Sequence, residues 1–473
     1  MSSITAPTPA VDPDHPVVPV APGRRGAELI MLAFAFALVA FAFANVGYSL
    51  KGRLPASMAE YLAAFIVIMV AGHLAVRRFA PWADPLLLPL AALLNGLGVV
   101  MTYRLAAQGN LLSAELSSSA TDIQILYTAI GVGCFVGVLV LVREPRVLQR
   151  YTYTLGALGL LLLALPAMLP RGISEVYGAR IQIRLGTFTI QPEEFAKLAL
   201  AIAFAGYLVA KRDVLALAGR RVLGIDLPRA RDLGPILVIW AASLLLLVFE
   251  SDVGTSAVFM GLFVGMLYIA TSRTSWLLLG FIMFVVGAYA ASKLFSHVGE
   301  RFDVWLHPFA GGNPSGNAFQ PLQGLYGMAS GGLLGKGLGG GQPYLTPLVQ
   351  SDMVFTAFGE ELGLAGCMAI LLIYALIVQR GLRTAISVKD PFSKLLAGGL
   401  AFMLALQVFV IVGGVTRLIP LTGITTPFLS QGGSSLVASW ILIALLVRLS
   451  DTARRPPPRP IQDEGLTQVV TLR

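Results

Sequence analysis

The chain has 473 residues, 56% of them hydrophobic and only 12% Asp, Glu, Lys or Arg, and its formal net charge is +9. A soluble protein carries roughly 25% charged residues, so this composition excludes a water-soluble globule, and it also excludes disordered and collagenous chains. The two cysteines, Cys134 and Cys367, lie in apolar runs, which excludes a secreted disulfide scaffold. The composition predicts an all-α, polytopic membrane protein whose positive charge faces anionic lipid rather than nucleic acid.

Two tails flank one predicted transmembrane domain, 24–450. Residues 1–23 are rich in Pro, Ala and Val and lack the basic start and apolar stretch of a signal peptide, so we expect a disordered cytoplasmic tail. Residues 451–473, with the run ARRPPPRP, are expected to form a second one. The domain contains about twelve apolar segments long enough to cross a ~30 Å hydrocarbon core. Their limits are 28–48, 59–76, 84–105, 122–142, 152–169, 194–210, 233–250, 253–271, 275–294, 353–379, 394–416 and 433–449.

The basic residues indicate how these segments are oriented. With the N-terminus inside, most Lys and Arg, including a cluster at 211–231, fall in cytoplasmic loops and tails, as the positive-inside rule requires. Both termini are therefore expected to be cytoplasmic, which requires an even number of spans. Three long outer loops follow from this topology, at 170–193, 295–352 and 417–432, and loops of this length are often functional.

Several charged side chains are expected at outer helix ends, where a charge needs a partner or a water-filled cavity. Glu194 and Lys197 share one face at the start of the sixth segment. Asp252 lies at the turn of a tight hairpin between the seventh and eighth segments, and Asp352 lies at the start of the tenth, where the helix dipole favours a carboxylate. These positions also fit a simpler interpretation, with two helix caps and an interfacial ion pair. Convergence on one membrane face favours a polar, anionic substrate presented from the lipid.

Other chemistries find little support in the sequence. The four histidines have no metal-ligand spacing. The glycine-rich run at 330–341 contains Lys336 but not the GxxxxGK[ST] pattern of a P-loop. Lys336 therefore belongs either to a flexible loop or to a backbone-lined site in which it meets phosphate, and the sequence leaves both interpretations open.

Five motifs carry a family resemblance. They are GARIQIRLGTFTIQPEEFAKLAL (178–200), SDVGTS (251–256), SGGLLGKGLGGGQP (330–343), SDMVFTAFGEELGLAG (351–366) and GVTRLIPLTGITTPFLSQGGSS (414–435). With these motifs in this order and spacing, the chain resembles the SEDS family, whose members include RodA, FtsW and SpoVE. Within the family it most resembles the RodA-type proteins of actinobacteria, which have two extra N-terminal spans before a ten-span core.

The resemblance implies a peptidoglycan glycosyltransferase of the bacterial cytoplasmic membrane. Such an enzyme polymerises lipid II, a disaccharide-peptide linked by pyrophosphate to undecaprenol, at the outer face during cell-wall elongation. The implied partner is a class B penicillin-binding protein, which crosslinks the new strand. The family's essential aspartate maps to Asp352, which is predicted to be the general base that takes a proton from the attacking sugar hydroxyl. No cofactor is firmly implied; Mg²⁺ or Mn²⁺ at Asp352 remains open.

The resemblance also assigns the surrounding residues. Positive charge for the departing undecaprenyl pyrophosphate would come from Lys197, Arg180, Lys336 or a metal. Glu194, Lys197 and Asp252 match further charged positions of the family motifs and are expected to shape the cavity. The other polar residues expected to line it are Ser351, Gln323, Arg417 and Ser434.

Some positions depart from the family pattern. Gln182 replaces an aromatic residue, Gln431 a tyrosine, Glu193 a serine and Ser351 a threonine. Because these positions touch the rim of the cavity, we expect altered substrate affinity or partner control but an active enzyme. Two rival functions remain. One is a transporter that flips lipid II without polymerising it, supported by the many spans and the charged cavity. The other is a non-catalytic scaffold for the penicillin-binding protein, supported by Gln182 and Gln431.

Overall fold

The computed structural model describes residues 25–108, 119–174, 182–185, 188–211, 220–222, 225–227, 238, 240–242, 253–310 and 313–456. The first helices are α1 (Arg25–Lys51), α2 (Met58–Phe79), α3 (Leu87–Gln108), α4 (Ala120–Leu141), the 3₁₀ turn η1 (Pro145–Tyr151), α5 (Thr152–Met168), α6 (Arg171–Ser174) and α7 (Pro192–Ala210). They are followed by α10 (Val253–Thr271), α11 (Ser275–Leu294), α12 (Ser296–Leu306), η2 (Asn313–Ser315), α13 (Phe319–Gly331), η3 (Pro343–Leu345), α14 (Val354–Ser387), α15 (Pro391–Val415) and α16 (Gly433–Arg454).

Among the described residues, four short strands form two antiparallel hairpins in the connecting segments. In the first hairpin, β1 (Ile183–Leu185) pairs with β2 (Phe188–Ile190), with Arg184 opposite Thr189. In the second, β3 (Arg220–Val222) pairs with β4 (Ile225–Leu227). Each strand is only three residues long and the other described elements are helices, so the predicted all-α class is confirmed.

The predicted apolar segments correspond closely to helices. Within the described residues, ten helices are long and apolar enough to cross a membrane. The segment predicted at 194–210 coincides with α7, which carries Glu193, Glu194 and Lys197 in its first turns. The segment predicted at 233–250, and with it the tight hairpin, falls mostly outside the described residues, so the count of twelve spans stays a prediction. The helices establish a multi-pass membrane protein.

Both described ends of the chain lie at one end of the bundle. At the start of α1, the Nε of Arg25 donates to the carbonyl of Pro81 at 3.1 Å. Near the end of α16, the carboxylate of Asp451 accepts the backbone N–H of Trp82 at 2.9 Å. Because both contacts converge on the short connection between α2 and α3, α1 begins on the side where α16 ends. This arrangement is the one required by an even number of spans.

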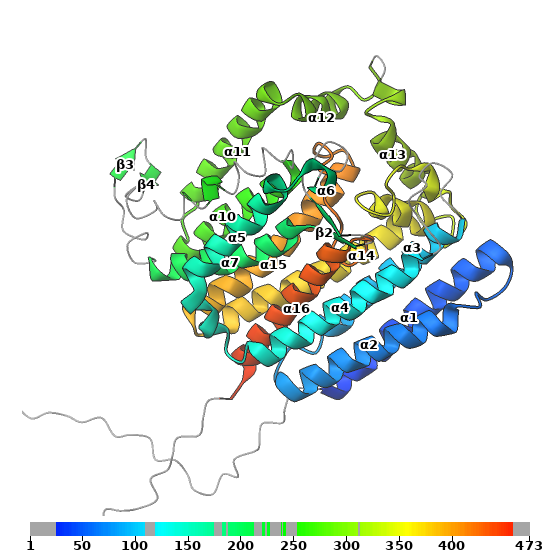
Figure 1. Ribbon diagram of the computed structural model, residues 1–473, viewed down its shortest axis with the longest axis horizontal. Helices are drawn as coiled ribbons and strands as arrows, with labels where there is room; N and C mark the ends of the chain where they lie inside the picture. The colour runs from blue at the N-terminus through cyan, green and yellow to red at the C-terminus, as the bar shows by residue number, and fades with distance from the viewer. Residues whose placement is uncertain are drawn as a thin grey trace, which may run out of the picture.

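The packing core surrounds α16. The buried indole of Trp440 packs edge-to-face against Phe135 of α4 and against Phe428, with ring centroids 5.8 and 5.4 Å apart. Its Nε1 donates to the Asn95 side chain of α3 at 3.0 Å. A Cβ on Gly131 would lie 2.6 Å from the indole, so only glycine lets α4 approach this closely. In Figure 1, α1 and α2 flank the bundle on one side, whereas α11 and α12 form its opposite edge.

Candidate active site

Asp352 lies at the end of the long loop, two residues before α14 begins. The residue is buried, with 8% of its surface exposed. Its carboxylate accepts a hydrogen bond from the Ser351 hydroxyl at 3.1 Å and from the side-chain amide of Gln320 at 3.3 and 3.4 Å. The N-cap of α14 is Met353, so Asp352 is not the helix cap that its position alone allowed.

The surroundings of Asp352 tune its proton affinity. Burial raises the pKa of Asp352 from its ordinary 3.8 to about 6, because desolvation disfavours the charged carboxylate. The Ser351 hydroxyl, the backbone N–H of Asp352, the Gln320 amide and the positive charge of Arg301 all lower this pKa, because they favour the ionised form. The result is a carboxylate that is ionised at neutral pH yet basic enough to accept a proton, which a general base requires.

A second loop fixes the backbone beside Asp352. Residues 417–432, between α15 and α16, approach the chain just before this carboxylate. The hydroxyl of Ser430 donates to the carbonyl of Ser351, and the backbone N–H of Gln431 donates to the carbonyl of Gln350 at 2.8 Å. The same Ser430 hydroxyl accepts the backbone N–H of Thr426 at 2.8 Å. Two predicted outer loops therefore hold each other in register at Asp352.

Arg417 begins this second loop and fastens it to α12. Its guanidinium donates to the carbonyl of Trp305 at 2.9 Å, and the Trp305 indole donates back to the carbonyl of Arg417 at 3.0 Å. The backbone of Arg417 is left-handed, with φ 61°. A non-glycine residue rarely adopts this conformation without compensating contacts, which the reciprocal pair supplies. Arg417, predicted to line the cavity, therefore has a clear anchoring contact.

Glu194 and Lys197 form the ion pair that their spacing predicted. The Lys197 ammonium lies 2.9 Å from the Glu194 carboxylate, and both side chains are buried. Lys197 also donates to the Gln407 side chain of α15 at 3.3 Å, and Gln407 donates to the carbonyl of Thr425 at 3.3 Å. This network links α7 through α15 to the loop 417–432.

The glycine-rich run is inserted into a break in α14. At Gly363 the helix has φ 67° and ψ −169°, which interrupts the backbone hydrogen-bond ladder. The run 332–337 satisfies the groups that the break frees. Lys336 N–H donates to the carbonyl of Glu360 at 3.1 Å, and Leu364 N–H donates to the carbonyl of Gly332 at 2.9 Å. A helix break buried in this way is stable because its polar groups regain partners.

The two acidic residues of the GEELG run bind this glycine-rich segment. Lys336 Nζ lies 2.8 Å from Glu360, so its ammonium has a carboxylate partner. Glu361 pairs with Arg104 of α3 at 2.7 Å, and both side chains are fully buried. Arg104 also donates to the carbonyl of Gly341 at 2.8 Å. The sequence analysis did not single out Arg104. An arginine inside an apolar segment could have been recognised there, because such a charge needs a buried partner.

The remaining predicted residues are placed as follows. The Ser434 hydroxyl accepts the backbone N–H of Gln191 at 2.9 Å and so steadies the start of α7. Gln323 lies on α13, but the residue of that helix whose amide reaches Asp352 is Gln320, which the sequence did not single out. Arg180 and Asp252 lie outside the described residues, and their roles stay predictions.

The donor set around Asp352 limits how a metal could bind. The described residues contain no group of three or more His, Cys, Asp or Glu side chains that could hold a metal ion. One carboxylate beside an amide and a hydroxyl fits a divalent cation only as one ligand among waters and substrate phosphates, which is the usual Mg²⁺ arrangement.

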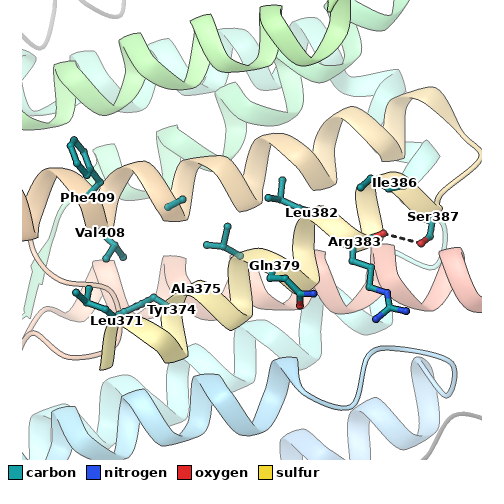
Figure 2. Close-up of a pocket in the computed structure, with 12 residues that line it drawn as sticks. Leu371, Tyr374, Ala375, Gln379, Leu382, Arg383, Ile386, Ser387, Val408 and Phe409 are labelled. Atoms are coloured by element: carbon teal, nitrogen blue, oxygen red, sulfur yellow. Dashed lines mark hydrogen bonds between the residues drawn. The ribbon is translucent and has the colours of Figure 1, made fainter. Parts of the chain in front are cut away.

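A separate cavity of about 820 Å³ lies between α14 and α15 (Figure 2). Its wall includes Leu371, Val408 and Phe409, and its polar residues include Gln379, Arg383 and Ser387. None of the predicted site residues lines it. It is an apolar groove between helices, and it contains no carboxylate that could serve as a base.

These features define a polytopic membrane protein with an aspartate-centred polar site where two long loops meet. A family model described as "Cell cycle protein", for FtsW, RodA and SpoVE, matches residues 84–455. The chain belongs to this family. The match begins just before α3, so α1 and α2 precede the region that the family model covers.

Individual relatives agree with this assignment. The peptidoglycan glycosyltransferase RodA of Mycobacterium tuberculosis is 48% identical over 440 residues, which cover 93% of each chain. The stage V sporulation protein E of Bacillus subtilis is 31% identical over 381 residues, which cover 78% of this chain and 98% of that protein. A chain from a solved peptidoglycan synthase complex that coordinates polymerization and crosslinking matches with a TM-score of 0.53 at 24% identity. That match covers 84% of this chain and 98% of the other, and it confirms the fold.

Proposed function

We infer that the chain is a peptidoglycan glycosyltransferase that polymerises lipid II at the outer face of the cytoplasmic membrane during cell-wall elongation. The relatives named as peptidoglycan glycosyltransferases RodA support the activity. The observation that carries the mechanism is the buried carboxylate of Asp352, whose pKa of about 6 suits proton abstraction near neutral pH.

In the proposed mechanism Asp352 acts as general base. It accepts the proton of the attacking sugar 4-hydroxyl while that oxygen forms a bond to the anomeric carbon. The bond between this carbon and the pyrophosphate oxygen breaks, and undecaprenyl pyrophosphate leaves with the electron pair. A single displacement of this kind inverts the anomeric configuration, as in inverting glycosidases. Gln320 and Ser351 orient the carboxylate, because both donate hydrogen bonds to it.

The neighbouring network has a supporting role in this proposal. Glu194 and Lys197 neutralise each other, and through Gln407 they hold the loop 417–432 against α15. The loop in turn holds the backbone of Ser351. These residues therefore shape the cavity, whereas Asp352 carries the chemistry. A divalent cation, Mg²⁺ or Mn²⁺, would enter with the substrate's phosphates and take Asp352 as one ligand.

The proposed partners follow from the same activity. Lipid II supplies both the growing strand and the incoming unit. A class B penicillin-binding protein crosslinks the product, and the similarity to a chain of a peptidoglycan synthase complex supports such an assembly.

One assay separates this function from its rivals. Purified protein, together with its penicillin-binding partner, is incubated in liposomes with labelled lipid II. Glycan polymer supports the glycosyltransferase. Movement of lipid II between leaflets without polymer would indicate a flippase. The absence of both polymer and movement would indicate a scaffold.

A further inference from the structure

Arg301 lies on α12, above the loop that fixes the Asp352 backbone. Its Nη1 donates to the carbonyl of Thr422 at 3.2 Å. The residue is only partly buried. Because a guanidinium has five N–H donors in a planar fork, this contact leaves donors for a second partner.

The position of Arg301 is fixed from two directions. One turn further along α12, Trp305 exchanges hydrogen bonds with Arg417 at 3.0 and 2.9 Å. Gly423 lies beside the guanidinium and has φ 75°. A Cβ added to Gly423 would meet only Nη2 of Arg301, at 3.9 Å. A left-handed glycine thus places open space, rather than a side chain, beside the free edge of the fork.

The same loop connects Arg301 to Asp352. Thr422 accepts from Arg301, and Ser430, eight residues later in the sequence, donates to the carbonyl of Ser351. The positive charge of Arg301 is near enough to lower the pKa of Asp352. A cation and the backbone beside the proposed base are therefore held by the same anchored loop, and the two charges are near enough to interact.

Two other described cations of the proposed site have carboxylate partners, and a third, Arg417, donates to the carbonyl of Trp305. Lys197 pairs with Glu194 at 2.9 Å, and Lys336 pairs with Glu360 at 2.8 Å. In the part of the chain that the structure describes, by contrast, no carboxylate lies within ion-pair distance of Arg301. A partly desolvated arginine without a carboxylate is suited to bind a phosphate group bidentately.

We propose that Arg301 binds the pyrophosphate of the lipid-linked glycosyl donor and stabilises it as it leaves. This assignment rests on the proposed function and adds a residue that neither the motifs nor the resemblance singled out. The guanidinium donates through its free edge to phosphate oxygens, while Asp352 removes the proton from the attacking hydroxyl. Lys197 and Lys336 keep their carboxylate partners and remain structural.

The test compares Arg301→Gln and Arg301→Lys with wild type, and Lys293→Gln serves as the matched control. Lys293 is an exposed cation at the end of α11 that lies over the Tyr289 ring. Two quantities are measured in liposomes of neutral phospholipid: kcat/KM for lipid II polymerisation, and the Kd of undecaprenyl pyrophosphate. A charge-assisted hydrogen bond is worth about 1.5–3 kcal/mol. Arg301→Gln should therefore lower kcat/KM and raise the Kd, each by roughly 10- to 100-fold.

The variants have distinct expected results. Arg301→Lys retains the charge but not the fork, so its Kd should lie between those of wild type and Arg301→Gln. Lys293→Gln should bind like wild type. The thermal unfolding midpoint shows whether Arg301→Gln is folded. If it is not, the Kd of Arg301→Lys compared with that of wild type tests the proposal.

Two results would overturn the proposal. One is an unchanged Kd for undecaprenyl pyrophosphate in Arg301→Gln. The other is a defect that appears only in liposomes containing phosphatidylglycerol, since Arg301 would then bind a lipid headgroup. The binding measurement does not need turnover. If the wild type binds undecaprenyl pyrophosphate through Arg301 but does not polymerise lipid II, the proposed function fails while this assignment stands.

Discussion

The side-chain amide of Gln320 donates to both carboxylate oxygens of Asp352, at 3.3 and 3.4 Å. Gln320 lies in the first turn of α13, and Asp352 lies two residues before α14, so the packing of these two helices sets the contact. The amide favours the ionised carboxylate and lowers its pKa. Gln320 is therefore expected to position the base and to control when it is ionised.

Replacing Gln320 with Leu should raise the pKa of Asp352, because a donor to the ionised form is lost while burial remains. The acidic limb of the kcat/KM profile should move to higher pH, so polymerisation should fall much more at pH 6 than at pH 7.5. A pH series of initial rates checks this. Gln323→Leu on the same helix should leave the acidic limb in place, and an equal shift in both variants would contradict the role of Gln320.

The wild-type enzyme should lose activity in mild acid. Asp352 has a pKa of about 6 and acts in its ionised form, so kcat/KM should be level above pH 7. At pH 5 about a tenth of the carboxylate is ionised, so the rate should be about tenfold lower. A profile that stays level down to pH 4.5 would mean that Asp352 is not the base.

Asp352 should also reduce the stability of the protein at neutral pH. Its pKa is raised from 3.8 to about 6 on folding, so the folded protein favours the protonated form. Ionisation therefore costs folding free energy above about pH 6, and the cost disappears below about pH 4. Asp352→Asn should be more stable than wild type at pH 7.5 by roughly 1–3 kcal/mol. Thermal unfolding of both proteins in detergent at pH 7.5 and at pH 4 measures the difference in stability. A gain in stability that persists at pH 4 would have another cause.

The Arg104–Glu361 pair should be essential for folding but not for chemistry. Both side chains are fully buried, so removing one partner leaves an uncompensated charge. Arg104→Met or Glu361→Leu should each destabilise the protein by about 3–5 kcal/mol, measured as thermal unfolding. The double variant should recover much of this loss. Double-variant instability equal to the sum of the single losses would show that the two residues act independently.

The sequence was sufficient to predict most of the fold. Apolar segments of membrane-spanning length are a strong signal, and all except 233–250 coincide with described helices. The Glu194–Lys197 pair was also predictable, because residues three apart on a helix share one face. The break at Gly363 was not, because the run that satisfies it comes from a loop about 30 residues earlier in the sequence.

The site was predictable at Asp352 and much less so around it. Arg301 and Gln320 occur in a long polar loop, where neither residue differs in pattern from its neighbours. Their placement depends on how α12 packs against the loop 417–432 and how α13 packs against α14, which is tertiary information. The resemblance pointed to Lys197 and Lys336 as cations for the leaving group. The structure shows both in ion pairs, and their role toward the leaving group stays a prediction.

Whether Asp352 is the base for polymerisation is tested by comparing Asp352→Asn with wild type on labelled lipid II. Asp303→Asn is the matched control, since Asp303 is an exposed carboxylate of α12 that accepts from the Asn313 side chain at 3.0 Å. We predict that Asp352→Asn folds and inserts into the membrane but forms no glycan polymer, while Asp303→Asn polymerises at the wild-type rate. Glycan synthesis by Asp352→Asn at a rate close to wild type would show that Asp352 is not the base.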